Sequence, residues 1–250
     1  MNTARLHVLE RALRLAGEHR AAGHDASAQL LFEQVLDADP ANGEAIDAIG
    51  PRRSLARRLV RRAARETVEA LTQRPRIYKY QILSTCPRVI GRPIVLQPVL
   101  FVGPGEVVLG EGVQFGWKAS PLFYAGYCHV EASRAHARIE VGERTEFNNN
   151  LMLKSEGAGI RVGRDGLFGA HIEIFDSDFH NLDPARRHEG TQRMASVEIG
   201  DNVFVGMGVK ILKGVTIGSD SVIGAGAVVA SSIPAGVIAA GNPARVLRGL

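Results

Sequence analysis

A parallel β-helix built from six-residue repeats, preceded by a small α-helical region, is the fold class that this 250-residue sequence predicts. The main observation is that an aliphatic residue returns every six positions, as Ile199, Val205, Ile211, Ile217, Ile223 and Val229. An α-helix repeats every 3.6 residues and an ordinary strand every two, so neither explains this step. Composition agrees, because 28 glycines and only 6% aromatic residues suit a core of small aliphatic side chains with many tight corners.

The period of six has a physical explanation. A short flat strand and a corner together take about six residues, and three such units return the chain above its start, about 4.8 Å higher. Each aliphatic anchor then points inward, while Gly, Asn and Asp at the corners tolerate left-handed backbone conformations. Further units of this kind begin at Leu109, Phe115, Val141, Phe147, Val162 and Phe168. We therefore expect a β-helix domain over residues 77–250 and a helical region over residues 1–76.

Residues 3–49 read as helices. Ala28, Phe32 and Pro40 have the spacing of a tetratricopeptide repeat, in which small and aromatic positions let two helices pack closely. Such repeats need neighbours to bury their faces, and one copy is visible here. We expect a lone helical hairpin that caps another element or assembles with other copies of the chain.

Residues 52–76 hold most of the excess positive charge, with nine arginines against two acidic residues. This segment reads as a helix opened by Pro51, with Leu55, Leu59 and Ala63 on one stripe. It is either a solvated helix docked through that stripe or a contact for an acidic surface or for self-assembly. Nucleic acid is not an expected partner, because no aromatic residues lie between the arginines.

The sequence also predicts a compartment. The N-terminal segment is interrupted by Arg5, Arg11 and Arg14 and lacks the apolar stretch of a signal peptide. No run of about 18 apolar residues predicts a membrane span. Two cysteines, Cys86 and Cys128, do not make a disulfide framework. A cytoplasmic protein is therefore expected.

The stretch "IGDNVFVGMGVKILKGVTIGSDSVIGAGAVV", followed by "AAGNPARVLR", resembles the hexapeptide-repeat acyltransferases. The likeness is greatest to the sugar O-acetyltransferases that act on galactosides, maltose and polysaccharide units. It covers residues 139–250 well and 88–138 loosely, and it does not extend to the helical region. The resemblance implies a left-handed coil, a homotrimer with active sites between neighbouring chains, and acetyl-CoA as donor. No metal is expected.

The catalytic candidate is His180. Ile174 and Ile199 are 25 positions apart, which is not a multiple of six, so residues 175–198 are expected to leave the coil as a loop. Acetyl transfer to a hydroxyl needs a group that takes the hydroxyl proton, and imidazole titrates in a suitable range. In the family that the chain resembles, a histidine in the corresponding loop does this.

Asp176 and Asp178 are substrate-binding candidates in the same loop. Side chains two residues apart point to the same side of an extended strand, so both carboxylates lie on the same side as His180 if the segment stays extended. They orient the imidazole, bind sugar hydroxyls or simply end the strand. The family also keeps an acceptor-binding asparagine, and Asn148 in "FNNNLM" is the best match. A structural asparagine corner is the alternative for Asn148.

Four residues are the candidates for binding the acetyl-CoA donor. The resemblance implies that a backbone amide near the "VGMG" corner, at Met207, faces the thioester oxygen. It also implies that the Ala225 amide, in "GAG", donates to the pantetheine. Arg245 and Arg248 suit the phosphates of coenzyme A.

The predicted function is acetyl-CoA-dependent O-acetylation of a sugar or glycan precursor, with His180 as general base. The nearest alternative is an N-acetyltransferase acting on a nucleotide-linked amino sugar, whose chemistry depends less on the histidine. A zinc enzyme resembling the carbonic anhydrases of this fold would need three converging histidines, which the spacings of His171, His180 and His188 do not match. A non-catalytic scaffold is the remaining alternative. The acceptor itself is not predictable from these residues.

Overall fold

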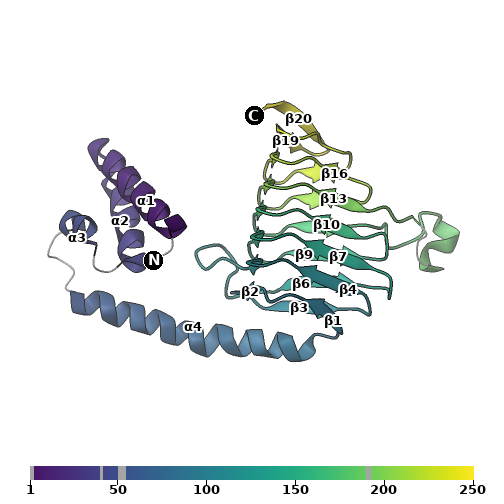
Figure 1. Ribbon diagram of the computed structural model, residues 1–250, viewed down its shortest axis with the longest axis horizontal. Coiled ribbons are helices and arrows are strands. Elements are labelled where there is room, and N and C mark those ends of the chain that lie inside the picture. Colours follow the sequence, from purple (N-terminus) through teal and green to yellow (C-terminus); the bar gives the residue numbers. More distant parts are fainter. Residues whose placement is uncertain (1–2, 40–41, 50–54, 190–192) are drawn as a thin grey trace. The chain divides into compact units, whose positions relative to one another are not determined.

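The computed structural model describes residues 3–39, 42–49, 55–189 and 193–250. The chain divides into two compact units, Met1–Glu69 and Ala70–Leu250, and the expected boundary at residue 76 falls within the second unit. Figure 1 shows helices in the first part of the chain and a stack of short strands in the second.

The N-terminal unit contains the predicted helical hairpin. Helices α1 (Thr3–Ala21) and α2 (Asp25–Ala38) pack on one another, and the short helix α3 (Gly43–Ile49) packs on α2. Ala28 and Phe32 are buried in the small core between these helices, at the positions where the sequence predicted close helix packing. Pro40 lies outside the described residues.

Helix α4 (Leu55–Leu83) is longer than the predicted Arg-rich helix. Pro51 and the side chains of Leu55 and Leu59 lie outside the described residues, and Ala63 is exposed. The later part of α4 packs through a polar residue, because the buried Gln73 donates to Phe123 O at 2.6 Å. Among the described ranges, no helix combines the length and apolar character needed to span a bilayer.

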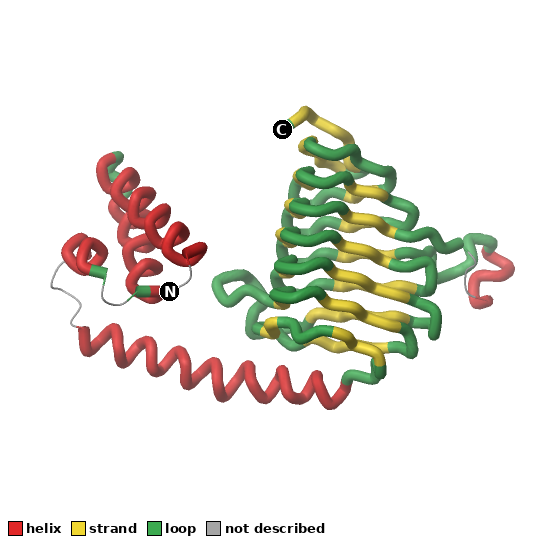
Figure 2. Tube along the Cα trace, in the orientation of Figure 1, coloured by secondary structure: helices red, strands yellow, loops and turns green. Residues whose placement is uncertain are grey.

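The second unit is a parallel β-helix with three sheets, as predicted (Figure 2). Sheet 1 contains β1 (Arg88–Ile90), β4 (Glu106–Leu109), β7 (Arg138–Val141), β10 (Ile160–Val162), β13 (Val197–Ile199) and β16 (Thr216–Ile217). Sheet 2 contains β2 (Ile94–Val95), β5 (Gln114–Phe115), β8 (Glu146–Phe147), β11 (Leu167–Phe168), β14 (Phe204–Val205), β17 (Val222–Ile223), β19 (Val237–Gly241) and β20 (Ala244–Gly249). Sheet 3 contains β3 (Val99–Val102), β6 (Cys128–Ala132), β9 (Met152–Ser155), β12 (Glu173–Phe175), β15 (Lys210–Ile211) and β18 (Val228–Val229). The left hand of the coil remains a prediction, because strand order alone does not define it.

The repeated anchors form the core. The six aliphatic anchors between positions 199 and 229 are each at most 3% exposed, so the period of six marks the inward positions. On sheet 2 the inward column includes Phe115, Phe147 and Phe168. The Phe115 and Phe147 rings stack with centroids 5.4 Å apart, and those of Phe147 and Phe168 are 4.7 Å apart. Aromatic packing therefore fills the lower coils, where the sequence repeat is least regular.

Three edges join the sheets, and each edge is a stack of corners. Edge 1/2 contains residues 110–113, 142–145, 163–166, 200–203 and 218–221. Edge 2/3 contains residues 116–127, 148–151, 169–172, 206–209 and 224–227. Edge 3/1 contains residues 133–137, 156–159, 176–189, 193–196 and 212–215. The connection between β12 and β13 is the loop that the sequence predicted between Ile174 and Ile199, and its described part includes a short 3₁₀ helix (Pro184–Glu189).

Candidate functional site

The loop that carries His180 has a hydrogen-bonded root on edge 3/1. The Ala195 amide donates to Asp176 O at 2.9 Å, and Ser177 and Met194 form an isolated antiparallel bridge. The two ends of the loop are thereby held together where they leave the coil. Figure 1 shows the loop, in green, projecting from the side of the stack.

Asp176 lies inside the coil and not on its surface. Its side chain is fully buried and accepts hydrogen bonds from Ser155 Oγ at 2.6 Å and from the Glu156 and Gly159 amides at 2.7 and 2.8 Å. The Gly157 amide is 3.3 Å from the same carboxylate. Of the roles open to Asp176, this geometry favours ending the strand: the carboxylate holds the corner of the coil below.

Asp178 connects the loop to the coil above. Its Oδ1 lies 2.5 Å from Lys213 Nζ, in the corner between β15 and β16. Its Oδ2 is buried and has no hydrogen-bond partner within the described part of the chain. The side chain therefore anchors the loop and keeps one acceptor unused.

His180 is exposed, and its backbone is tightly held. Its amide donates to Asp178 O at 2.6 Å, and the preceding residue, Phe179, has a left-handed φ of 60°. The Phe179 ring packs against Phe175, with centroids 5.2 Å apart, and lies 5.0 Å from Lys154 Nζ. A bulky residue rarely adopts positive φ, so these contacts stabilise a strained turn directly before the histidine.

The imidazole of His180 has one nitrogen in use. Its Nδ1 lies 3.3 Å from Arg187 O. A carbonyl oxygen only accepts, so this hydrogen bond places the proton of the neutral ring on Nδ1 and leaves the lone pair on Nε2. That tautomer is the one required of a general base acting through Nε2.

Three of the other predicted residues, Asn148, Met207 and Ala225, are stacked along edge 2/3. The Gly208 amide donates to Ala170 O at 2.9 Å, and the Gly226 amide donates to Met207 O at 2.8 Å, so successive corners lie one above another. Met207 and Ala225 are both exposed, and neither backbone amide donates a hydrogen bond to any described residue. Two free donors therefore lie at adjacent corners.

Asn148 lies two corners below Met207 on the same edge. Its Oδ1 accepts from the Asn149 amide at 2.7 Å, and its Nδ2 group donates to no group in the described ranges. In contrast, the side chain of Asn149 is fully buried and Asn150 Oδ1 accepts from Gln97. Of the asparagines at this corner, Asn149 is the one whose Nδ2 group donates within the described ranges, so the donor of Asn148 is available to a ligand.

Arg245 and Arg248 are exposed on β20, at the C-terminal end of the coil. Each guanidinium contacts a backbone carbonyl next to it, Ala244 O at 2.9 Å and Gly249 O at 3.0 Å. Both charges are accessible to a ligand. The structure does not bring all the candidates together in one chain. His180 is on edge 3/1, whereas Asn148 and the backbone amides of Met207 and Ala225 are on edge 2/3.

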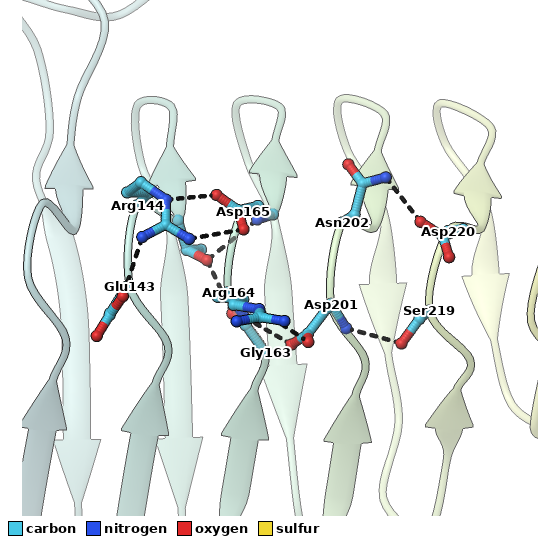
Figure 3. A network of polar contacts seen from close by, with 11 residues as sticks. Glu143, Arg144, Gly163, Arg164, Asp165, Asp201, Asn202, Ser219 and Asp220 are labelled. Atoms are coloured by element: carbon cyan, nitrogen blue, oxygen red, sulfur yellow. Dashed lines mark hydrogen bonds and ion pairs between the residues drawn. The ribbon is translucent and has the colours of Figure 1, made fainter.

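On edge 1/2 the charged side chains pair with one another, which leaves few charges for a ligand (Figure 3). Arg144 makes two hydrogen bonds to Asp165, at 2.7 and 2.9 Å, and Arg164 lies 3.2 Å from Asp201. Hydrogen bonding to Arg144 lowers the pKa of Asp165, and the same bonds raise that of Arg144. This ladder links neighbouring coils at the surface.

Sequence reasoning missed a second loop, residues 117–127 on edge 2/3. The available signal was the spacing of two inward positions: Phe115 and Val130 are 15 residues apart, again not a multiple of six. Figure 1 shows this loop in teal, on the side of the stack away from the His180 loop. Within the described residues, no three His, Cys, Asp or Glu side chains are placed to hold a metal ion.

Comparisons with known proteins identify the repeat. Residues 196–231 match the family described as bacterial transferase hexapeptide (six repeats), so the predicted resemblance is confirmed there. The galactoside O-acetyltransferase of Lactococcus lactis is 38% identical over 128 residues, which are 51% of this chain and 58% of that protein. The galactoside O-acetyltransferase of Escherichia coli is 35% identical over 112 residues, 45% of this chain and 54% of that protein.

A solved structure of a galactoside acetyltransferase in complex with coenzyme A also aligns with the chain. It has 30% sequence identity and a TM-score of 0.42, and the alignment covers 55% of this chain and 64% of that chain. The chain spans between 52% and 60% of the length of the first curated relatives that it matches.

Proposed function

We propose that this protein is an acetyl-CoA-dependent O-acetyltransferase that modifies a hydroxyl of a sugar or glycan precursor. The observation that carries the proposal is the state of His180: an exposed imidazole with Nδ1 bound to a carbonyl and Nε2 available, on a loop held at its root. The names of the two galactoside O-acetyltransferase relatives support the sugar acceptor and the acetyl group.

The proposed reaction is direct transfer between two bound substrates. Nε2 of His180 takes the proton of the acceptor hydroxyl as its oxygen attacks the thioester carbonyl carbon. The amides of Met207 and Ala225, which have no partner among the described residues, are the candidates to stabilise the tetrahedral oxyanion and to hold the pantetheine. The C–S bond then breaks, and the imidazolium returns the proton to the leaving thiolate. Asn148 donates its side-chain amide to the acceptor.

The donor is proposed to lie along edge 2/3 toward the C-terminal end. Met207, Ala225 and the exposed Arg245 and Arg248 follow one another in that direction, so the reactive thioester and the phosphates of coenzyme A have separate contacts. Arginine suits phosphate because its donors match the oxygen geometry.

A homotrimer is part of the proposal. His180 and Asn148 are on the two edges that border sheet 3, so one chain alone separates the base from the acceptor contact. If sheet 3 of each copy faces a common threefold axis, edge 3/1 of one copy meets edge 2/3 of the next. Light scattering on the purified chain tests the trimer, and a monomer with full activity would contradict the shared site.

The helical region and the compartment complete the proposal. Nine arginines against two acidic residues in 52–76 support contact with an acidic surface or with another copy through α4. Co-sedimentation with acidic vesicles tests the contact with an acidic surface, and light scattering tests the contact with another copy. We propose a cytoplasmic location, because acetyl-CoA is available there and both Cys86 and Cys128 are free thiols.

The central test is turnover of His180→Ala with acetyl-CoA and a panel of saccharides. Loss of the base is expected to lower kcat by about 10²–10⁴-fold and to change the KM for acetyl-CoA less than about twofold. His188→Ala is the matched control, since His188 is an exposed histidine of the same loop and is expected to behave like the parent.

Other outcomes of this test would select the alternatives. Nearly full activity of His180→Ala on a sugar hydroxyl would refute the assignment of the base. Activity confined to an amino sugar and independent of His180 would favour N-acetylation. Zinc that is lost with His180→Ala would point to a metal enzyme, and failure of the parent to bind acetyl-CoA would favour a scaffold.

A further inference from the structure

The loop 117–127 is fixed by three buried amide side chains. Gln73, Gln97 and Asn149 are each at most 1% exposed, although none of them carries an apolar side chain. The side-chain NH2 group of each residue donates to a backbone carbonyl oxygen of this loop. Burying an amide is unfavourable unless its hydrogen bonds are made, so these contacts together specify one conformation of the loop.

Of the three side chains, Asn149 makes the most hydrogen bonds to the loop itself. Its Nδ2 donates to Trp117 O at 3.1 Å and to Pro121 O at 2.9 Å, and its Oδ1 accepts from the Trp117 amide at 3.0 Å. Gln97 Nε2 adds hydrogen bonds to Leu122 O at 2.9 Å and to Ala125 O at 3.1 Å. The backbone of Trp117 is therefore attached to the residue that directly follows Asn148.

The rigid loop presents aromatic surface to solvent. Phe123 is buried beneath it, whereas Trp117 is 49% exposed and Tyr124 is 57% exposed. Trp117 is the only tryptophan of the chain, and its Nε1 donates to no group within the described ranges. Large, rigid, amphipathic rings held at a surface supply binding area at low entropic cost, because few torsions are lost.

The position of the loop matches the acceptor side of the proposed site. Along edge 2/3 the order of corners is loop 117–127, Asn148, residues 169–172, Met207 and Ala225. The loop that carries His180 leaves the coil at the level of residues 169–172, since it follows β12 of the same turn. The donor contacts lie on the C-terminal side of that level, so the N-terminal side is left for the acceptor.

We propose that Trp117 is the stacking ring of an acceptor subsite for a pyranose, with loop 117–127 as its wall. A pyranose has an apolar face of C–H groups and a rim of hydroxyls, so an indole ring covers the face while Nε1 and the Asn148 amide serve the rim. β-Galactosides suit this site because their C–H groups at C1, C3, C4 and C5 lie on one face of the ring. The inference rests on the proposed O-acetyltransferase function, which requires a sugar on this side of Asn148.

The first experiment is binding without catalysis. Because Trp117 is the only tryptophan, its fluorescence reports directly on its own surroundings. Methyl β-D-galactoside added to the full-length protein without acetyl-CoA is expected to give a saturable change in emission. Galactitol, which carries hydroxyls but no ring face, is the matched control and is expected to give none.

The second experiment is steady-state kinetics with the same galactoside. Trp117→Ala is expected to raise the acceptor KM about 10-fold, with kcat lowered less and the acetyl-CoA KM unchanged, while Trp117→Phe keeps most of the affinity. Tyr78→Ala removes another exposed aromatic residue, on α4, and is expected to match the parent.

The outcomes separate this inference from the proposed function. Acetylation of the galactoside with no fluorescence change, or equal rises in both KM values for Trp117→Ala, would overturn the subsite and leave the function standing. A change in the oligomeric state of Trp117→Ala would assign the ring to an interface and also overturn it. A saturable fluorescence change in a protein that acetylates no sugar would support the subsite and refute the function. Neither binding nor acetylation would overturn both.

Discussion

Lys213 Nζ lies 2.5 Å from Asp178 Oδ1, and this ion pair ties the root of the His180 loop to the next coil. Both side chains are partly buried, at 30% and 22% exposure, so water screens the pair less than it screens a surface pair. No sequence pattern pointed to Lys213. The pair makes the position of the proposed base dependent on a residue more than 30 positions away.

Lys213→Met is expected to lower kcat about 10-fold without a change in the acetyl-CoA KM, because small displacements of a catalytic group reduce rates steeply. The loosened loop should also be cut faster by trypsin at Arg186 and Arg187. Arg164→Met is the control, since Arg164 pairs at 3.2 Å with Asp201 on edge 1/2, away from the loop. Parent-like turnover of Lys213→Met would contradict a positioning role, and rescue by Lys213→Arg would support it.

Asp176→Ala is expected to lower the free energy of unfolding by about 3–5 kcal/mol, because it leaves several buried donors without an acceptor. Urea unfolding of the full-length protein measures this loss. Asp183→Ala is the control: Asp183 is exposed and accepts from the Ala185 amide at 3.0 Å, so its loss should cost about 1 kcal/mol or less. Equal losses for the two variants would contradict the structural role of Asp176.

The contrast between the two loops explains how far the sequence predicts this structure. The His180 loop interrupts a run of regular aliphatic anchors, so the break between Ile174 and Ile199 is visible in the spacing alone. Loop 117–127 interrupts coils whose inward positions alternate between aromatic and aliphatic residues, such as Phe115 and Val130. Where the inward residues are of both kinds, the six-residue repeat is hard to recognise, and so is an interruption of it.

Side-chain roles were harder to predict than elements. Asp176 and Asp178 alternate correctly for a shared site, but their partners lie on other coils: Gly159 below and Lys213 above. Stacking of coils brings together residues separated by 17 and 35 positions, and a single sequence contains no record of which carboxylate meets which donor. The role of Asn148 stays a prediction: its Oδ1 accepts from the Asn149 amide, and its Nδ2 group donates to no described residue.

Coenzyme A binding tests the C-terminal end of the proposed donor groove. Arg245→Ala and Arg248→Ala are each expected to weaken binding by about 2- to 30-fold, the effect of losing an exposed phosphate contact of about 0.5–2 kcal/mol. Calorimetry with coenzyme A measures the change. Arg161→Ala is the control, because Arg161 is an exposed arginine on β10 in sheet 1. Unchanged affinity in both variants would place the phosphates elsewhere.

Thiol labelling tests the packing beneath loop 117–127. Cys128 is fully buried, and burial raises the pKa of its thiol to about 12. The reactive thiolate is therefore nearly absent at pH 8, so iodoacetamide should modify Cys86, which is half-buried, and leave Cys128 intact until urea unfolds the protein. Peptide mass spectrometry distinguishes the two sites, with Cys86→Ser as the control. Native labelling of Cys128 would show that this part of the coil opens.

The pH dependence of stability is expected to involve Glu131 on the outer face of sheet 3. Burial acts to raise the pKa of this carboxyl, but hydrogen bonds from His129 and Ser133 and the nearby Lys154 outweigh it, so the net pKa is lowered from 4.5. A carboxyl with a lower pKa in the folded state stabilises the fold above its unfolded pKa. That contribution is lost as the pH falls from about 4.5 through the folded pKa.

Glu131→Gln should therefore be less stable than the parent at pH 7 by about 0.5–1 kcal/mol, a modest value because the pair is partly exposed to water. The difference should shrink toward zero near pH 3, where the parent carboxyl is protonated as well. Urea unfolding at both pH values measures it. Ser133→Ala, which removes a hydroxyl 2.8 Å from Glu131 Oε1 and no charge, should show a smaller loss with the same direction. A difference between Glu131→Gln and the parent that is equally large at pH 3 would mean that packing, and not ionisation, sets the contribution of this residue.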